Sequence, residues 1–304
     1  MGNTRDIKKR MKAVGNIKRI TRTMQMIATS KFSKAQQHAV ASKPYTSALL
    51  DLVAELSQAE GADHPLLSGV PEAADQPELT LILSSDRGLC GPYNGSILRV
   101  AARHLRNTPA ALDGPIEVVG KKGVSMLKFN GFNLSQHHQQ FGDKPPLDLV
   151  SRLADSYAER YLAGEISAIR VIYMKYISAG KQRPEVLQLL PFAPPPAEDP
   201  EAAIAEAAGK PKTAAGGGTL QFEFSPSEAE LLGRIVPAAV RTVLYQCFND
   251  AVVSEHIARM IAMKAATDNA GKMGKALKTK FNRARQAQIT TELTEIISGA
   301  AALE

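Results

Sequence analysis

The residues most suggestive of chemistry lie in the stretch LILSSDRGLCGPYNGS, residues 81–96. A buried strand that runs into a glycine-rich turn and then a helix is where nucleotide-binding folds hold phosphate groups. Gly88, Gly91 and Gly95, however, have neither the G-x-G-x-x-G spacing nor the Gly-Lys-Ser/Thr ending of a phosphate loop. The run VVGKKG at 118–123 lacks the four-residue spacer as well. We therefore expect a tight turn that lets strand and helix pack, rather than a nucleotide site.

Histidine and cysteine offer no clearer candidates for catalysis or metal binding. His137 and His138 are adjacent, so they do not share one face of a helix or strand, and the other histidines are solitary. Surface or capping roles are expected for all of them. Cys90 beside Arg87 could be a low-pKa thiol, but no second cysteine is near it, and a packed small residue is expected. Cys90 and Cys247 fit a reducing setting. The sequence thus predicts no catalytic, metal-binding or cofactor-binding residues, and a chain that is not an enzyme by itself.

The charge of the chain is concentrated at its two ends. Residues 1–34 hold ten Lys/Arg and one acid (+9), and residues 255–285 hold eight Lys/Arg and two acids (+6). Subtracting these 15 charges from the net +7 leaves −8 for the remainder. Two basic ends suggest an acidic partner, a nucleic acid or an anionic surface. No run approaches the roughly 18 apolar residues of a membrane span, and the N-terminus lacks the apolar region of a secretory signal.

The first segment, residues 1–61, is predicted to be a long helix of a coiled coil. Asn3 or Thr4 can cap it, Pro44 should kink or interrupt it, and Gly61 should end it. Apolar residues at three- and four-residue steps predict its packed stripe, namely Ile7, Met11, Val14, Ile17, Ile20, Met24 and Ile27, continued by Ala28, Phe32, Ala35 and Ala39 and then by Leu49, Val53 and Leu56.

The middle segment, residues 78–190, alternates strands with helices and predicts a Rossmann-like α/β domain with a parallel-type sheet. Expected strands cover 79–85, 116–120, 168–177 and a last run at 186–190. Expected helices cover 94–106, 121–129 and 147–162. Residues 191–218, rich in Pro, Ala and Gly, are expected to be a flexible insertion.

The last segment, residues 225–304, is predicted to be a second long helix, capped by Ser225 or Ser227. If Pro237, Gly271 and Gly274 do not break it, some 70 residues would span on the order of 100 Å. The two long helices are expected to form an antiparallel coiled coil. The chain ends on an apolar stripe of Ile289, Leu293, Ile296, Ile297 and Ala300 that runs into small residues, and such an end needs something to enclose it.

Four runs are similar to the γ subunit of the F-type ATP synthase of bacteria. They are RITRTMQMIATSKF at 19–32, SSDRGLCG at 84–91, SEHIARMIAMKAATDNA at 254–270 and NRARQAQITTELTEIISGA at 282–300. The resemblance covers both terminal helices and most of the middle domain, in the same order. The main rival interpretation is a basic coiled-coil nucleic-acid-binding protein, against which stands the scarcity of aromatic residues near the N-terminus, where Phe32 is alone among the first forty residues.

The resemblance implies a central rotor shaft that couples proton-driven rotation of a c ring to the three catalytic β-subunit sites for ATP synthesis, or hydrolysis in reverse. The implied partners are three α and three β subunits, the ε subunit and the c ring, with no nucleic acid. The implied location is the cytoplasmic face of the bacterial plasma membrane, as a peripheral part of the complex. No cofactor is implied.

The resemblance also assigns roles to individual residues. Contact with β-subunit loops and control of coupling are implied for Met24, Arg259, Arg285, Gln286, Thr290 and Glu292. A bearing tip is implied for Ile296, Ile297, Gly299 and Ala300, and a family signature loop for Asp86, Arg87, Gly88, Leu89, Cys90 and Gly91. The regulatory dithiol of chloroplast members has no counterpart near Pro191, so thiol control is not expected.

Overall fold

The computed structural model describes residues 4–57, 64–193 and 228–301. These residues form two compact units, and each is described by itself. Unit 1 comprises residues 1–32, 89–91 and 256–304, and unit 2 comprises residues 33–88 and 92–255, so both long terminal helices contribute to both units. The expected domain ranges 1–61, 78–190, 191–218 and 225–304 remain a prediction, and most of 191–218 lies outside the described residues.

The described elements alternate largely as the sequence indicates. The helices are α1 (Thr4–Leu56), α2 (Pro65–Ser68), the 3₁₀ turn η1 (Pro71–Ala73), α3 (Tyr93–Asn107), α4 (Pro109–Leu112), α5 (Lys121–Phe129), α6 (Leu147–Leu162) and α8 (Glu228–Ala301). The strands are β1 (Glu78–Leu83), β2 (Ile116–Val119), β3 (Gln136–His138), β4 (Ala168–Ser178) and β5 (Lys181–Leu190). No described helix is long and apolar enough to cross a bilayer.

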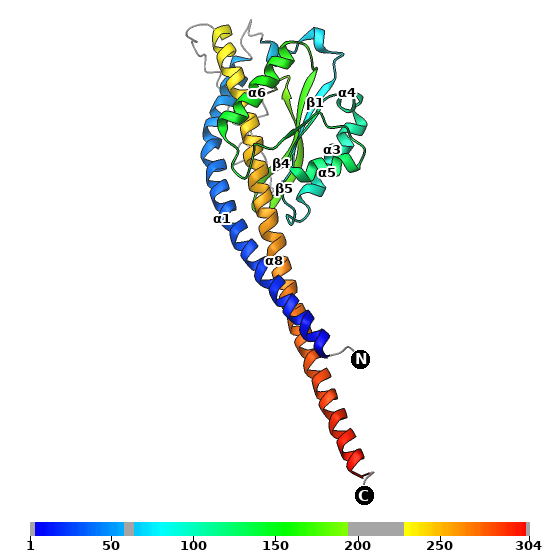
Figure 1. Ribbon diagram of the computed structural model, residues 1–304. Helices are drawn as coiled ribbons and strands as arrows, with labels where there is room; N and C mark the ends of the chain where they lie inside the picture. Colours follow the sequence, from blue (N-terminus) through cyan, green and yellow to red (C-terminus); the bar gives the residue numbers. More distant parts are fainter. Residues whose placement is uncertain (1–3, 58–63, 194–227, 302–304) are drawn as a thin grey trace, which may run out of the picture. The chain divides into compact units, whose positions relative to one another are not determined.

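Unit 2 is built on a five-stranded sheet in the order β3-β2-β1-β4-β5. The first four strands are parallel, and β5 returns antiparallel to β4. In Figure 1, α3 and α5 lie on one face of this sheet and α6 lies on the other. The predicted parallel-type α/β fold is confirmed by this pairing. Parallel neighbours need a crossover connection, and helices lie in the crossovers here.

The core of unit 2 lies on the α6 side of the sheet. β1 is buried along its whole length, and its alternate residues Leu79, Leu81 and Leu83 face this core. Strands β4 and β5, helix α6, residues 33–56 of α1 and residues 228–255 of α8 supply most of the other side chains, among them Val53 and Leu244. Part of each terminal helix is therefore core of the α/β unit, because its apolar stripe is covered there by the sheet.

Two strands differ from the sequence-based expectation. β3 was not predicted, because its residues, Gln136–His138, are polar and occupy a short edge position. β5 begins at Lys181 rather than at residue 186, and it contains Pro184. Proline is tolerated there because β5 is an edge strand, in which a missing backbone donor need not break a ladder.

The long helices are more continuous than expected. α1 runs through Pro44, so the predicted interruption there is wrong. The carbonyl of Val40, which loses its partner to the proline ring, belongs to an exposed residue and can be hydrated. α8 extends over 74 residues through Pro237 and both glycines. The expected caps Ser225 and Ser227 and the expected stop at Gly61 lie outside the described residues.

Candidate functional site: the paired terminal helices

Unit 1 is an antiparallel pair formed by the start of α1 and the end of α8. The hydroxyl of Thr4 lies 3.1 Å from Oε1 of Gln288, and the hydroxyls of Thr21 and Thr267 lie 2.8 Å apart. Between these contacts, the ammonium of Lys18 lies close to Gly271. The predicted coiled coil is therefore present in unit 1, with small and polar side chains along part of its seam.

The seam residues of α1 follow a strict heptad spacing, and the periodicity of the sequence predicted only some of them. On α1 it passes through Ile7, Met11, Val14, Lys18, Thr21, Gln25, Ala28 and Phe32, most of them at least half-buried. Ile17, Ile20 and Ile27 were expected in this stripe, but they are 51%, 56% and 52% exposed. Two successive three-residue steps, as from Val14 to Ile20, rotate a position by about 120° off the face. The packed seam instead keeps the average step of 3.5 residues.

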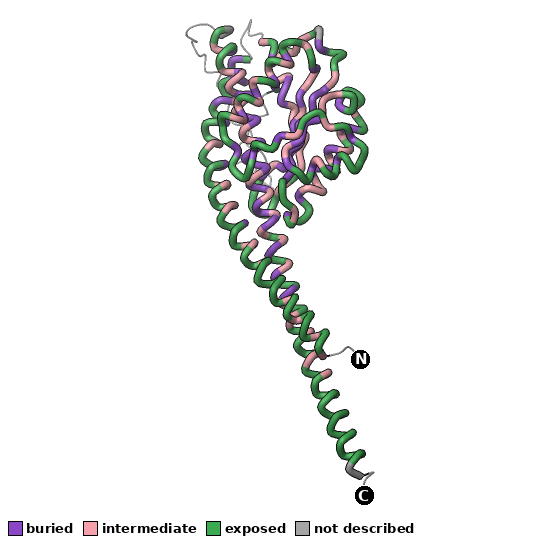
Figure 2. The backbone as a smooth tube through the Cα atoms, in the orientation of Figure 1, coloured by how far each residue is buried: buried purple, intermediate pink, exposed green. Residues whose placement is uncertain are grey.

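The end of α8 extends beyond its partner helix. α1 begins at Thr4, which contacts Gln288, so the following residues of α8 have no helix of the described chain beside them. Figure 2 shows this end exposed all round. Ile289, Leu293, Ile296 and Ile297 are all exposed, and Ile296 reaches 72%. These residues belong to the apolar stripe that the sequence predicts at the end of the chain, and no described residue covers them.

The signature loop contributes its tip to unit 1. Leu89 has a φ of 65° and is 61% exposed, an unusual state for a large apolar residue. Cys90 is buried, and Gly91, at φ 58°, lies against Ala258 and Ala262 of α8. The loop tip is thus seated on α8 through a glycine that supplies both the left-handed backbone and the close approach.

The residues assigned to coupling and β-subunit contact lie in two separate parts of unit 1. Met24 is half-buried and Arg259 is buried. The four residues Arg285, Gln286, Thr290 and Glu292 are exposed near the end of α8, where Gln288 donates to Glu292 at 2.9 Å.

The helix register separates these two parts. The Thr21–Thr267 contact places Met24 beside the turn of α8 that precedes Thr267. Gln286 lies roughly 30 Å further along α8, at 1.5 Å per residue. The structure therefore groups the four distal residues and leaves Met24 away from them. Their assigned roles remain predictions.

The glycine-containing turn between β2 and α5 is filled by the protein's own groups. Every backbone N–H of the first turn of α5 has an internal acceptor: Lys121 donates to Asp86 Oδ1 (3.1 Å), Lys122 to the Ser85 carbonyl (3.0 Å), Gly123 to Ser84 Oγ (2.9 Å) and Val124 to the Gly120 carbonyl (3.4 Å). A helix N-terminus binds phosphate through such N–H groups. Here a carboxylate, a carbonyl and a hydroxyl already occupy them, which agrees with the prediction of a packing turn.

Two histidines, His138 and His256, contradict the expectation of surface or capping positions because they are buried, and a third, His104, is half-buried. His138 is buried on β3, and its Nε2 lies 2.7 Å from Glu117 of β2. His104 of α3 lies 2.7 Å from Glu78, and His256 is buried. His64 does cap a helix, since its Nδ1 accepts from the backbone N–H of Leu66. An acid inside the otherwise apolar runs IEVV and ELTLIL was the missed signal, because a buried carboxylate requires a partner.

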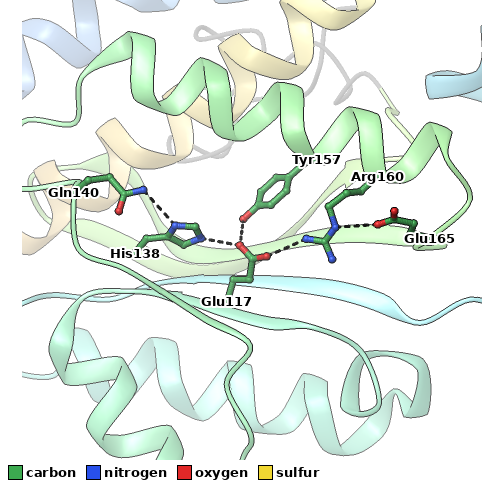
Figure 3. Close-up of polar contacts among 6 residues, drawn as sticks. All are labelled: Glu117, His138, Gln140, Tyr157, Arg160 and Glu165. Carbon is green, nitrogen blue, oxygen red and sulfur yellow. Dashed lines mark hydrogen bonds and ion pairs between the residues drawn. The ribbon is translucent and has the colours of Figure 1, made fainter.

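Glu117 is the centre of a buried polar network, shown in Figure 3. Tyr157 donates to its Oε2 at 2.7 Å, and Arg160, both from α6, pairs with its Oε1 at 3.1 Å. Burial raises the pKa of Glu117, but hydrogen bonds from His138 and Tyr157 and the charges of His138 and Arg160 outweigh it and lower the pKa below 4.5. The network ties β2 and β3 to α6.

This network lacks the access that catalysis requires. The side chains of Glu117 and His138 are 4% and 2% exposed, and both oxygens of the carboxylate are already paired. Burial and the neighbouring carboxylate raise the pKa of Tyr157 well above 10. Burial raises the pKa of the Cys247 thiol in the same way, and Cys90 is buried too. Among the described residues, no group of three His, Cys, Asp or Glu side chains could hold a metal ion.

Comparison with known proteins decides the family. A family model described as ATP synthase matches residues 3–303. The ATP synthase gamma chain of Rhodopirellula baltica is 42% identical over 309 residues, and that of Pelotomaculum thermopropionicum is 33% identical over 307 residues. Each alignment covers 100% of both chains. The chain belongs to the ATP synthase gamma chain family.

Solved structures agree with this family in fold. A chain of the Euglena gracilis mitochondrial ATP synthase, from a structure of OSCP, F1 and the c-ring, superposes with a TM-score of 0.61 at 17% identity. That match covers 99% of this chain and 95% of the other. A chain of the central stalk and c-ring of Tetrahymena thermophila gives 0.53 at 18% identity, covering 81% and 99%. The long helices and the α/β unit are thus the fold of the family.

Gly120 provides a test of the close packing around the filled turn. Gly120 and Gly131 both have positive φ, 93° and 82°, but only at Gly120 would an added Cβ collide with backbone, the carbonyl of Ser84. We expect Gly131→Ala to cost about 1 kcal/mol of unfolding free energy through backbone strain. Gly120→Ala should cost at least about 2 kcal/mol more through the clash. Urea unfolding of both variants measures this, and equal losses would contradict the packing described.

Glu117 provides a test of the buried network. Because its pKa is lowered in the folded state, its stabilisation is present above about pH 4.5 and is lost as the pH falls through the folded-state pKa. Glu117→Gln should therefore lower the unfolding free energy at pH 7 by about 3 kcal/mol, and by less at pH 3. Glu165→Gln is the matched control, since Glu165 is exposed and pairs with Arg160 at 3.5 Å. Urea titrations at both pH values decide, and a pH-independent loss would argue against the network.

Proposed function

We propose that this chain is the central rotor shaft of an F-type ATP synthase, with no bond chemistry of its own. It couples rotation of a c ring, driven by proton transport, to the conformational cycle of three catalytic β-subunit sites. The observation that carries this function is the projecting end of α8, apolar and slender, in a chain whose family is that of ATP synthase gamma chains. The comparisons give no support to the nucleic-acid-binding alternative.

The projecting end is suited to a bearing. Enclosing its apolar side chains in a partner is favourable, by roughly 25 cal/mol for each Å² of apolar surface removed from water. Apolar contact is non-directional, so it holds the shaft in place without favouring one angle. Ile296, Ile297, Gly299 and Ala300 form the proposed tip, inside a collar of three α and three β subunits.

The exposed polar residues just before the tip are the proposed point of transmission. Arg285, Gln286, Thr290 and Glu292 would contact β-subunit loops. Coupling requires that each angle of the shaft stabilises one conformation of each β subunit over the others. Directional hydrogen bonds and charges, unlike the apolar tip, can make that distinction. Met24 and Arg259 are proposed to tune this coupling, and Asp86–Gly91 is proposed as the family signature loop.

The same proposal covers the remaining assignments. The chain would act as a non-catalytic subunit, and the filled turn at α5 and the enclosed Glu117 network support this for the described residues. Its further partners would be the ε subunit and the c ring. Its place would be the cytoplasmic face of a bacterial plasma membrane, held there peripherally through the complex.

Removing the end of α8 tests the function. We expect the full chain to assemble with matched α and β subunits as one copy per three αβ pairs and to support ATP hydrolysis. Deleting residues 285–304 should lower the ATPase rate several-fold, because directional contacts and tip are both lost. The double variant Ile296→Ala/Ile297→Ala keeps a slender, uncharged tip and should retain most activity. Failure of the full chain to join competent α and β subunits would overturn the proposal.

Charge on the shaft tests the coupling role of Met24. Met24→Lys adds a cation at a half-buried position of an already basic helix, so it should disturb contacts with acidic partner loops. Met26→Lys is the matched control, because Met26 is 66% exposed and carries the same added charge. Protons pumped per ATP hydrolysed should fall in the first variant more than in the second, with assembly unchanged. An unaltered ratio in Met24→Lys would show that Met24 is misplaced.

A further inference from the structure

Two neighbouring helices on one face of unit 2 carry cations and no acidic residue. Helices α3 and α5 lie beside each other on the same face of the sheet (Figure 1). Neither helix contains an acidic residue. Their exposed cations are Arg99, Arg103, Arg106, Lys121, Lys122 and Lys128. We call this surface the α3–α5 face.

The cations of the α3–α5 face are not neutralised by acids of the described residues, and only Arg106 packs over an aromatic ring, that of Phe132. None of the six forms an ion pair with a carboxylate of the described residues. Glu78 and Glu117, the buried acids of the neighbouring strands, are paired with other groups. Asp86, at the border of the face, accepts from the backbone of α5. Six like charges on two short helices repel one another, so folding alone does not explain them.

The same face presents an exposed aromatic side chain. Phe129, the last residue of α5, is 90% exposed, and Met126, one turn earlier, is 43% exposed. Nearby in sequence, Phe132 is buried, and the guanidinium of Arg106 lies 5.9 Å from its ring centroid. Phe129 therefore contributes nothing to the core, although its neighbour does.

We propose that the α3–α5 face docks an acidic protein surface that has an apolar recess for Phe129. The inference rests on the proposed function, because the partner is taken to be another subunit of the same ATP synthase. Arginine and exposed aromatic residues are the side chains that carry most binding energy at protein interfaces. Arg99, Arg103 and Arg106 recur at four- and three-residue steps on one side of α3, and each can bind a carboxylate through two parallel hydrogen bonds.

An anionic membrane is the other surface that cations and an aromatic residue could meet. Membrane binding grows with the apolar area that enters the bilayer. α5 has nine residues and offers the bilayer two apolar side chains, Phe129 and Met126. The apolar contribution is therefore small, whereas one recess can enclose Phe129 fully. The protein surface is the occupant that this geometry favours.

A photoreactive phenylalanine analogue at position 129 tests the proposal in the assembled complex. Because Phe129 is exposed, its replacement leaves the core of unit 2 intact. Irradiation should give an adduct with a segment of another subunit rich in Asp and Glu, identified by mass spectrometry. The same analogue at Tyr45, 63% exposed on α1, is the control for non-specific adducts. Arg99→Glu/Arg103→Glu should lower the yield at position 129 about tenfold, since this pair of reversals replaces attraction by repulsion.

Each outcome decides the matter. An adduct with an acidic segment that the charge reversals suppress supports the α3–α5 face as a docking surface. Adducts with lipid, no adduct above the Tyr45 control, or a yield that is insensitive to the reversals would overturn it. Assembly with α and β subunits and the ATPase rate, measured on the same samples, report on the rotor function separately. A working complex without the adduct therefore refutes the docking surface alone.

Discussion

The structure depends on one requirement: the apolar stripe of a long helix must be covered by something. Along α8 the cover changes from the sheet and α6 in unit 2 to the start of α1 in unit 1. Past Gln288 the chain provides none in the described residues. Fully burying one side chain such as Ile296 is worth about 1.5–3 kcal/mol. Four such side chains remain exposed at this end, which is the reason for proposing that other subunits enclose it.

The seam of unit 1 contains polar residues at positions that could hold apolar ones. Lys18, Thr21 and Gln25 occupy positions that generic coiled coils fill with apolar residues, and Gly271 of α8 lies beside Lys18. Polar residues at such positions lower stability but fix the register of the pair. Gly271, which has no side chain, leaves room for the Lys18 side chain in the seam. A helix pair of fixed register suits a part that is proposed to turn inside a ring.

Much of the fold could be predicted from the sequence, because periodicity reports which side of an element is covered. The long helices, the strand β1 and the helix α5 followed from it directly. The residues that form the seam of unit 1 could not all be predicted in this way. Ile17 and Ile20 continue the apolar pattern of the sequence, but the 3.5-residue repeat places them away from the partner helix. The short polar strand β3 and the pairing of Glu117 with His138 depend on contacts between distant residues, which no local pattern reveals. The exposed apolar end was visible in the sequence, but the sequence of this chain does not contain the residues proposed to enclose it.

Direct observation of rotation tests the central claim. Cys90 and Cys247 are buried, so a cysteine introduced at the exposed position Asp113 is a selective handle for a bead. With the α and β subunits fixed to a surface and ATP supplied, the bead should turn stepwise in one direction, and it should stop when ATP is withdrawn. A bead that stays at one angle, while the same immobilised complexes hydrolyse ATP at the normal rate, would contradict the rotor function.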